Sequence, residues 1–152
     1  MSEHIALIRK KIDHLKRMQG YLAYSLAQTL PLVPIVDWLT MTPDQHEALA
    51  AFRVRFSEFQ EQLGKAMRAI AREEEQDTEP FSSVLLYMEK LGILDSVEQW
   101  KLLRELRNAV NHEYEEDSER LSEFFQELVQ STPLLFQYFD QLVNFCDETY
   151  SS

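Results

Sequence analysis

Apolar residues recur at every third or fourth position along most of the chain, which is the spacing of one buried face of an α-helix. No long stretch alternates between apolar and polar residues, as a half-buried strand does. The segments with helical spacing begin near Glu3, Pro43, Pro80, Asp95 and Asp117, with a last one after Pro133. The pattern therefore predicts an all-α, up-and-down bundle of about five to six helices, in a single domain over residues 1–152.

The second segment carries the strongest apolar stripe. Its apolar residues at helical spacing are Leu49, Phe52, Phe56, Phe59, Leu63, Met67 and Ile70. A stripe with three phenylalanines is far more typical of a protein core than of a cofactor site, so we expect these side chains to be buried.

Several helix ends carry start or stop patterns. Thr42 followed by Pro43 is typical of a helix start, with a hydroxyl cap and a proline in the first turn. Gly92 is expected to end the short third helix, because glycine adopts left-handed backbone angles at little cost. Asp95, with Glu98 three residues later, predicts that the fourth helix begins at a capping box.

Prolines mark two further places where helices are expected to stop. Residues 30–39 contain Pro31 and Pro34, which remove hydrogen-bond donors and restrict the residues before them. This segment is too apolar for a free linker, so we expect an ordered connector that packs on the core. The Ser-Thr-Pro sequence that ends at Pro133 repeats the cap-and-proline pattern, and it predicts a break or kink in the last helical segment.

The composition narrows the class of protein. Of the 152 residues, 45% are hydrophobic and 27% are charged, which is typical of a folded globular protein. The net charge of −11 means that any binding to nucleic acid needs a local basic patch. The lone Cys146 excludes an intramolecular disulfide and fits a reducing compartment. No apolar run approaches the roughly 18 residues of a transmembrane helix, so we expect a cytoplasmic protein with no membrane partner.

Polar chemistry is concentrated at residues 104–114, where a helical pattern gives way to an acidic run. Arg107 offers a planar fork that suits a phosphate, and His112 can transfer a proton near neutral pH. Together they are suited to metal-free RNA cleavage, which needs two proton-transfer groups, so a two-fold dimer would have to bring two motifs together. The alternative is structural: the arginine forms a surface ion pair, and the histidine complements the helix dipole.

The sequence gives no indication of a metal or a cofactor. The four histidines are widely scattered and Cys146 stands alone, so no pair of metal ligands appears at the usual spacing. A glycine-rich phosphate loop and the paired aspartates of a nucleotidyltransferase are also absent from the sequence.

The run Arg107-Asn-Ala-Val-Asn-His112-Glu-Tyr114 resembles the R-x-x-x-x-H-x-Y signature of HepT-like toxins, which belong to the HEPN superfamily. Residues 52–64 are similar to the second-helix segment of HepT-like and nucleotidyltransferase-substrate-binding chains. The resemblance implies a homodimeric, metal-independent endoribonuclease with the motifs facing each other across the dimer interface. It makes Arg107 and His112 catalytic and gives Asn108 the role of orienting them.

The resemblance also implies a partner and a form of control. The partner is an MNT-type nucleotidyltransferase antitoxin, in the cytoplasm of a bacterium or archaeon, that neutralises the toxin by AMPylation of Tyr114. The added charge and bulk so close to His112 would exclude RNA. Arg104 and Lys101 would extend the RNA-binding surface beside the motif. The alternatives are a non-catalytic helical module that binds a nucleotidyltransferase, and a plain helical interaction protein in which the motif is coincidental.

Overall fold

The computed structural model of the protein describes residues 3–109 and 117–151. All regular structure in these two ranges is helical, which confirms the predicted all-α class. The helices are α1 (Glu3–Thr29), α2 (Pro43–Glu73), α3 (Phe81–Lys90), α4 (Val97–Asn108) and α5 (Ser118–Thr149), with two 3₁₀ turns, Leu30–Leu32 and Trp38–Thr40, between α1 and α2. None of these described helices is long and apolar enough to cross a membrane.

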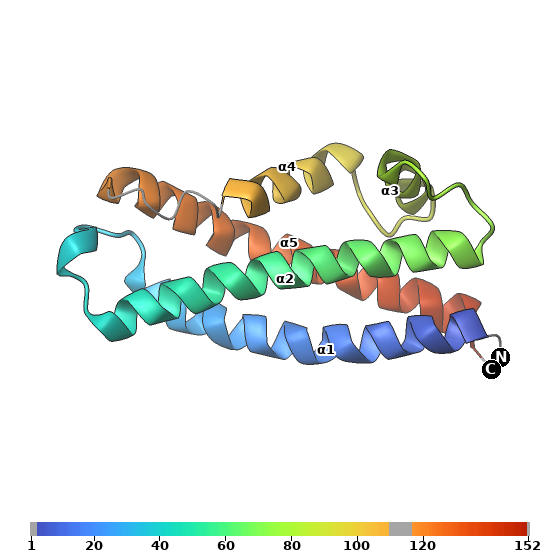
Figure 1. Ribbon diagram of the computed structural model, residues 1–152, viewed down its shortest axis with the longest axis horizontal. Helices are drawn as coiled ribbons and strands as arrows, with labels where there is room; N and C mark the ends of the chain where they lie inside the picture. The colour runs from blue at the N-terminus through green and yellow to red at the C-terminus, as the bar shows by residue number, and fades with distance from the viewer. Residues whose placement is uncertain (1–2, 110–116, 152) are drawn as a thin grey trace.

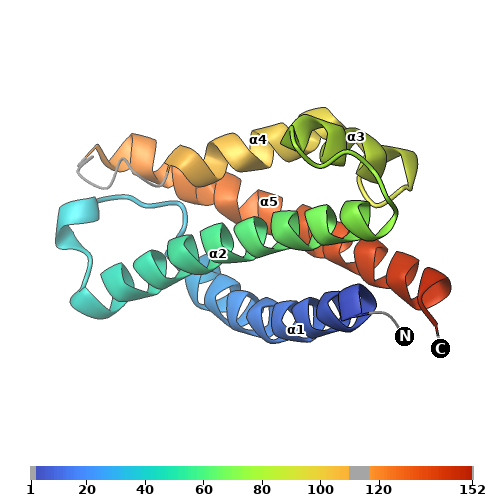
Figure 2. The ribbon, with the colours of Figure 1, turned by 45° about the vertical axis from the view of Figure 1, so that its right-hand side comes forward.

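Of the three long helices, α2 and α5 run in the same direction along the molecule and α1 runs in the opposite one (Figure 1). α1 and α2 lie side by side in opposite directions, and α5 packs against both. The shorter α3 and α4 cover α2 on the side away from α1, as the second view also shows (Figure 2). This arrangement places α4 between α2 and α5, so that each side of α4 faces a long helix.

The phenylalanine-rich stripe of α2 forms the centre of the core, as predicted. Its residues are all 0% exposed: Leu49, Phe52, Phe56, Phe59, Leu63, Met67 and Ile70. The ring of Phe59 packs edge-on against Phe136 and Phe139 of α5, with centroid distances of 5.7 and 5.6 Å. Burying a side chain of this size contributes about 1.5–3 kcal/mol, so the stripe is a major source of the stability of the bundle.

The start of α2 and the end of α3 confirm the capping predictions. The Thr42 hydroxyl accepts the backbone N–H of Gln45 at 3.2 Å, and the Gln45 side chain accepts the backbone N–H of Thr42 at 2.9 Å. This is a complete capping box. Gly92 follows α3 with a φ of 79°, a left-handed angle that most other residues adopt only with strain.

The predicted start of α4 is wrong by one residue. Ser96, not Asp95, is the cap: its hydroxyl accepts the backbone N–H groups of Glu98 and Gln99 at 3.1 and 3.4 Å. The Asp95 carboxylate instead accepts a hydrogen bond from the Gln137 side chain of α5 at 2.8 Å. The tertiary contact with α5 therefore occupies the side chain that the local sequence favoured as the cap.

Of the predicted break or kink at Pro133, the break is wrong, because α5 continues from Ser118 to Thr149. Proline removes one backbone donor, but the buried residues on either side, Leu128 and Leu135, stay on the same packed face. The hydroxyl of Thr132 donates to the carbonyl oxygen of Leu128 at 2.8 Å. Continuous burial of the apolar face therefore outweighs the loss of a single hydrogen bond.

The connector between α1 and α2 is ordered and packs on the core, as predicted. The backbone N–H of Ile35 donates to the Ser122 hydroxyl at 2.8 Å, and that of Trp38 donates to the Ser118 hydroxyl at 2.9 Å. The Trp38 ring stacks over Phe125 with a centroid distance of 6.3 Å. The connector is thereby fixed to the first turns of α5.

Arg9 links α1 to the end of α5. Its guanidinium donates to the carboxylate of Asp147 at 2.7 Å and to the backbone oxygens of Cys146 and Tyr150 at 3.0 and 3.4 Å. The oxygens at the end of a helix lack partners within the helix and carry partial negative charge, so a cation placed there is stabilising. Arg9 thus contributes to the packing of α1 against α5.

We predict that Arg9→Met lowers the free energy of unfolding by about 1–2 kcal/mol, because partly exposed, charge-assisted hydrogen bonds are lost. Urea unfolding followed by circular dichroism measures this change. Lys10→Met is the matched control, since it removes the same charge from an exposed position of α1. Equal destabilisation by the two substitutions would contradict the role assigned to Arg9.

The thiol of Cys146 is expected to be unreactive in the folded protein. The residue is 0% exposed, and burial raises the pKa of its thiol to about 12. The thiol therefore stays protonated as pH rises until it approaches that value, and the protonated form is a poor nucleophile. We predict negligible labelling by a thiol-specific reagent at about pH 8 in the native state and full labelling in urea. Rapid native labelling would show that the site opens.

Candidate functional site

The structure describes four of the predicted site residues and leaves two outside the described ranges. Lys101, Arg104, Arg107 and Asn108 all lie on α4, which ends at Asn108 with Ala109 as its cap. His112 and Tyr114 fall outside the described residues, so their catalytic and regulatory roles stay predictions.

Arg104 and Arg107 line one groove, between α4 and α2, with a volume of about 250 Å³. Arg104 is exposed and Arg107 is half-buried, and neither forms an ion pair with a described residue. The other residues that line the groove come from α2, from the start of α3 and from α4: Gln60, Glu61, Gly64, Lys65, Arg68, Phe81 and Trp100. We call this site the cationic groove.

The groove is basic although the chain is strongly acidic. Its lining holds four cationic side chains, those of Lys65, Arg68, Arg104 and Arg107, against the single carboxylate of Glu61. That carboxylate lies 3.7 Å from the ammonium of Lys65, which offsets part of its charge. On a chain with a net charge of −11, the groove supplies the local basic patch that binding to a phosphate needs.

Lys65 and Arg68 are members of the groove that the sequence did not indicate. Together with Glu61 and Gly64 they share one face of α2, at helical spacing. That spacing marks them as neighbours on one helix, but only the packing of α4 on α2 brings them beside Arg104 and Arg107.

Gly64 makes the floor of the groove. A Cβ atom added there would lie 3.4 Å from Cζ of Phe81 and 3.5 Å from Cζ2 of Trp100, which is ordinary van der Waals contact. The missing side chain therefore lets Phe81 and Trp100 pack close to the backbone of α2. The guanidinium of Arg68 lies over the Phe81 ring at 5.0 Å from its centroid, a cation–π contact that holds both side chains in place.

The other two predicted site residues on α4 lie apart from the groove. Lys101 pairs with Glu98 at 3.6 Å and lines a separate hollow near the start of α4. Asn108 is exposed on the last turn and is not part of the groove lining. Of the two residues predicted to extend the RNA-binding surface, the structure thus brings only Arg104 beside Arg107.

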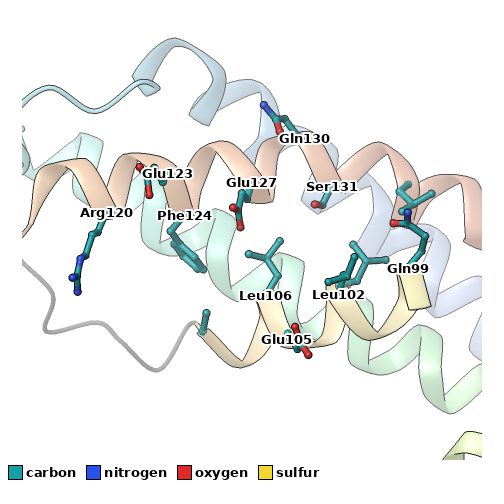
Figure 3. Close-up of a pocket in the computed structure, with 13 residues that line it drawn as sticks. Gln99, Leu102, Glu105, Leu106, Arg120, Glu123, Phe124, Glu127, Gln130 and Ser131 are labelled. Atoms are coloured by element: carbon teal, nitrogen blue, oxygen red, sulfur yellow. The ribbon is translucent and has the colours of Figure 1, made fainter. Parts of the chain in front are cut away.

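The side of α4 that faces α5 carries an excess of acidic side chains, unlike the cationic groove. A cleft of about 580 Å³ separates α4 from α5, and its walls hold Glu105, Glu123 and Glu127 against the single cation of Arg120. Its apolar lining includes Leu102, which is 58% exposed, together with Leu106, Phe124 and Leu134. Figure 3 shows Leu106 and Phe124 directed into the space between the two helices. We call this site the acidic cleft, and its charge opposes the binding of a phosphate.

Tyr138 of α5 is a buried tyrosine that lines neither of these sites. Burial raises the pKa of Tyr138 to about 12, with a smaller effect from Asp95, so this phenol does not transfer protons near neutral pH. The described lining of the cationic groove contains no histidine, and the described residues contain no cluster of side chains suited to a metal ion. The described groove is therefore suited to binding an anion. A group for proton transfer would have to come from elsewhere.

Comparison with known proteins adds no relative. The chain matches no protein family, no characterised protein and no solved structure. Evidence for its function therefore comes from its own residues: the motif in the sequence and the charge and shape of the two sites beside α4.

Proposed function

We propose that the protein is a HepT-like toxin: a homodimeric, metal-independent endoribonuclease that uses Arg107 and His112 and is silenced by AMPylation of Tyr114. The observation that carries the proposal is the position of Arg107. It lines a groove with three further cations on a chain that is otherwise acidic, and it forms no ion pair with a described residue. A phosphate is the ligand that such a set of side chains favours.

The proposed reaction assigns a separate task to each residue of the motif. His112 takes the proton of the RNA 2′-hydroxyl as its oxygen bonds to phosphorus. The bond from phosphorus to the 5′-oxygen then breaks, and a second His112, from the other protomer, protonates the leaving oxygen. Arg107 stabilises the extra negative charge on the phosphorane. The products are a 2′,3′-cyclic phosphate and a free 5′-hydroxyl, and Asn108 orients the reacting groups.

The proposed control acts through the same charges. A nucleotidyltransferase partner of the MNT type would transfer AMP from ATP to the Tyr114 hydroxyl, with release of pyrophosphate. The new phosphodiester lies two residues from His112 in the sequence, so it would compete with an RNA phosphate for Arg104 and Arg107.

The second candidate function is a non-catalytic module that binds a nucleotidyltransferase. The acidic cleft favours it, because exposed Leu102 lies over an apolar lining that carboxylates surround. A cleft of this kind suits a protein segment with apolar anchors and a basic rim. In this case the R-x-x-x-x-H-x-Y motif would serve assembly, and the purified chain would not cut RNA.

We predict that Arg107→Gln and His112→Ala each reduce RNA cleavage by about 100-fold or more, because each removes a group that acts in the transition state. The assay follows labelled RNA in the presence of EDTA, so that any cleavage is independent of divalent metal. Arg17→Gln, at an exposed position of α1, is the matched control and should leave cleavage unchanged. Full activity in a folded Arg107→Gln variant would refute the catalytic assignment, and an inactive wild-type chain would favour the binding module.

The AMPylation proposal has its own test. Incubation with the partner nucleotidyltransferase and ATP should raise the intact mass by whole multiples of one AMP group and abolish cleavage. Tyr114→Phe should prevent the mass gain, since it removes only the accepting hydroxyl. Persistence of the gain in this variant would place the acceptor elsewhere.

A further inference from the structure

The acidic cleft between α4 and α5 leaves apolar side chains accessible to solvent. Leu102 is 58% exposed, and Leu106, Phe124 and Leu134 are only partly buried although they line the same space. Leu106 and Phe124 enter this space from its opposite walls (Figure 3). Single exposed apolar residues are ordinary on a protein surface, whereas a hollowed cluster of them marks a place where another molecule binds.

The form of the cleft favours a helix as the occupant. On α4 the lining residues Gln99, Leu102, Leu106 and Ala109 recur at three- and four-residue steps, so the cleft follows the helix for about 15 Å. Its other wall is α5, which runs in the opposite direction to α4 (Figure 1). A groove between two such helices accepts a third helix, whose apolar side chains pack between the ridges of the first two.

The charge of the cleft indicates the charge of the occupant. Glu105, Glu123 and Glu127 are exposed and form no ion pair with a described residue. The single cation of the lining, Arg120, lies 3.8 Å from the carboxylate of Asp117, which offsets part of its charge. Carboxylates beside an apolar strip attract cations on both sides of an apolar face. The complement of the cleft is therefore an amphipathic helix that carries lysines or arginines beside its apolar stripe.

A second copy of the chain does not meet this requirement through the same surface. A two-fold contact places each surface patch against itself. The three carboxylates of the cleft would then face the same three carboxylates of the other copy, and like charges at close range repel. A contact between two different surfaces of identical chains would continue into an open series of copies unless it closed as a ring. The occupant that fits is a helix of another protein.

We propose that the acidic cleft binds a basic amphipathic helix of a partner protein. Leu102, Leu106 and Phe124 receive the apolar face of that helix, and Glu123 and Glu127 pair with its cations. The inference goes beyond the proposed function, because it assigns a surface and a chemistry to the partner and does not depend on RNA cleavage. The cationic groove stays accessible, since it lies between α4 and α2.

The test measures the binding of a labelled peptide to the full chain by fluorescence anisotropy. The probe is an alanine-based helical peptide of about 16 residues, long enough to span the cleft, with leucines at three- and four-residue steps and lysines on both sides of that stripe. A second peptide has glutamate in place of every lysine, and a third has glutamine in place of every leucine. We expect the first peptide to bind at least about tenfold more tightly than either of the others, and its affinity to fall as salt is raised. Equal binding of the acidic peptide would overturn the inference.

Leu102→Ala tests the apolar anchor. Because Leu102 is 58% exposed, the variant should keep the fold and the thermal stability of the wild type. We expect it to weaken binding of the basic peptide by about tenfold or more, the effect of one leucine that is buried on binding. Leu86→Ala is the matched control, since Leu86 is 60% exposed on α3 and does not line the cleft. Wild-type affinity in Leu102→Ala would show that the peptide binds elsewhere.

Glu123→Gln combined with Glu127→Gln tests the charge of the cleft. We expect about three- to tenfold weaker binding at low salt and a smaller dependence on salt, because two exposed ion pairs with the peptide are lost. The matched control combines Glu47→Gln with Glu58→Gln, which removes the same charge from exposed positions of α2. If the two double variants weakened binding equally, the attraction would come from the overall charge of the chain, and the inference would fail.

The outcomes separate this inference from the proposed function. Peptide binding that Leu102→Ala weakens, in a chain that does not cut RNA, would keep the docking site and refute the nuclease. RNA cleavage by a chain that does not bind the basic peptide would keep the nuclease and refute the docking site. Sedimentation of the chain alone should be the same for the wild type and Leu102→Ala. Loss of self-association in this variant would place a second copy in the cleft and overturn the inference.

Discussion

The structure depends on the burial of one helix, α2. Its apolar stripe has no exposure to solvent, and each of the other four described helices packs against it. α1 and α5 cover most of the stripe, so α3 and α4 are left with the remaining side of α2 (Figure 2). On that side Gly64 lets Phe81 and Trp100 come close to the helix. The position of the cationic groove is thus a consequence of how the core is filled.

Much of the fold follows from the sequence because its strongest patterns agree with one another. Helical spacing, the Thr42 cap and Gly92 all indicate the elements that the structure contains. The sequence-based errors occur where a long-range contact overrides a local preference. Asp95 is drawn to α5 and leaves the cap to the next residue, and the packed face of α5 carries the helix through Pro133. Local patterns do not contain this information, because it depends on residues far away in the chain.

The candidate site is predictable only in part, because its residues come from distant parts of the chain. The motif that starts at the end of α4 identified Arg107 and its neighbour Arg104 without any knowledge of the fold. Lys65 and Arg68 join them from α2, more than thirty positions earlier in the chain. The burial of Gln60, whose Oε1 atom accepts no hydrogen bond from the described part of the chain, cannot be anticipated either, since most glutamines are exposed and fully hydrated. Helical spacing identifies the residues on one wall of the cationic groove. The residues on the opposite wall can be identified only from the tertiary structure.

The opposite charges on the two sides of α4 affect how ligands would approach the molecule. One helix of twelve residues separates a groove with an excess of cations from a cleft with an excess of carboxylates. Charges are screened over a Debye length of about 8 Å at physiological ionic strength, so the two potentials stay largely distinct across the width of a helix. α4 would therefore sort incoming molecules by charge, with anionic chains directed to one side and basic surfaces to the other. A nucleic acid and a protein partner would then be able to occupy the molecule together without competing for the same surface.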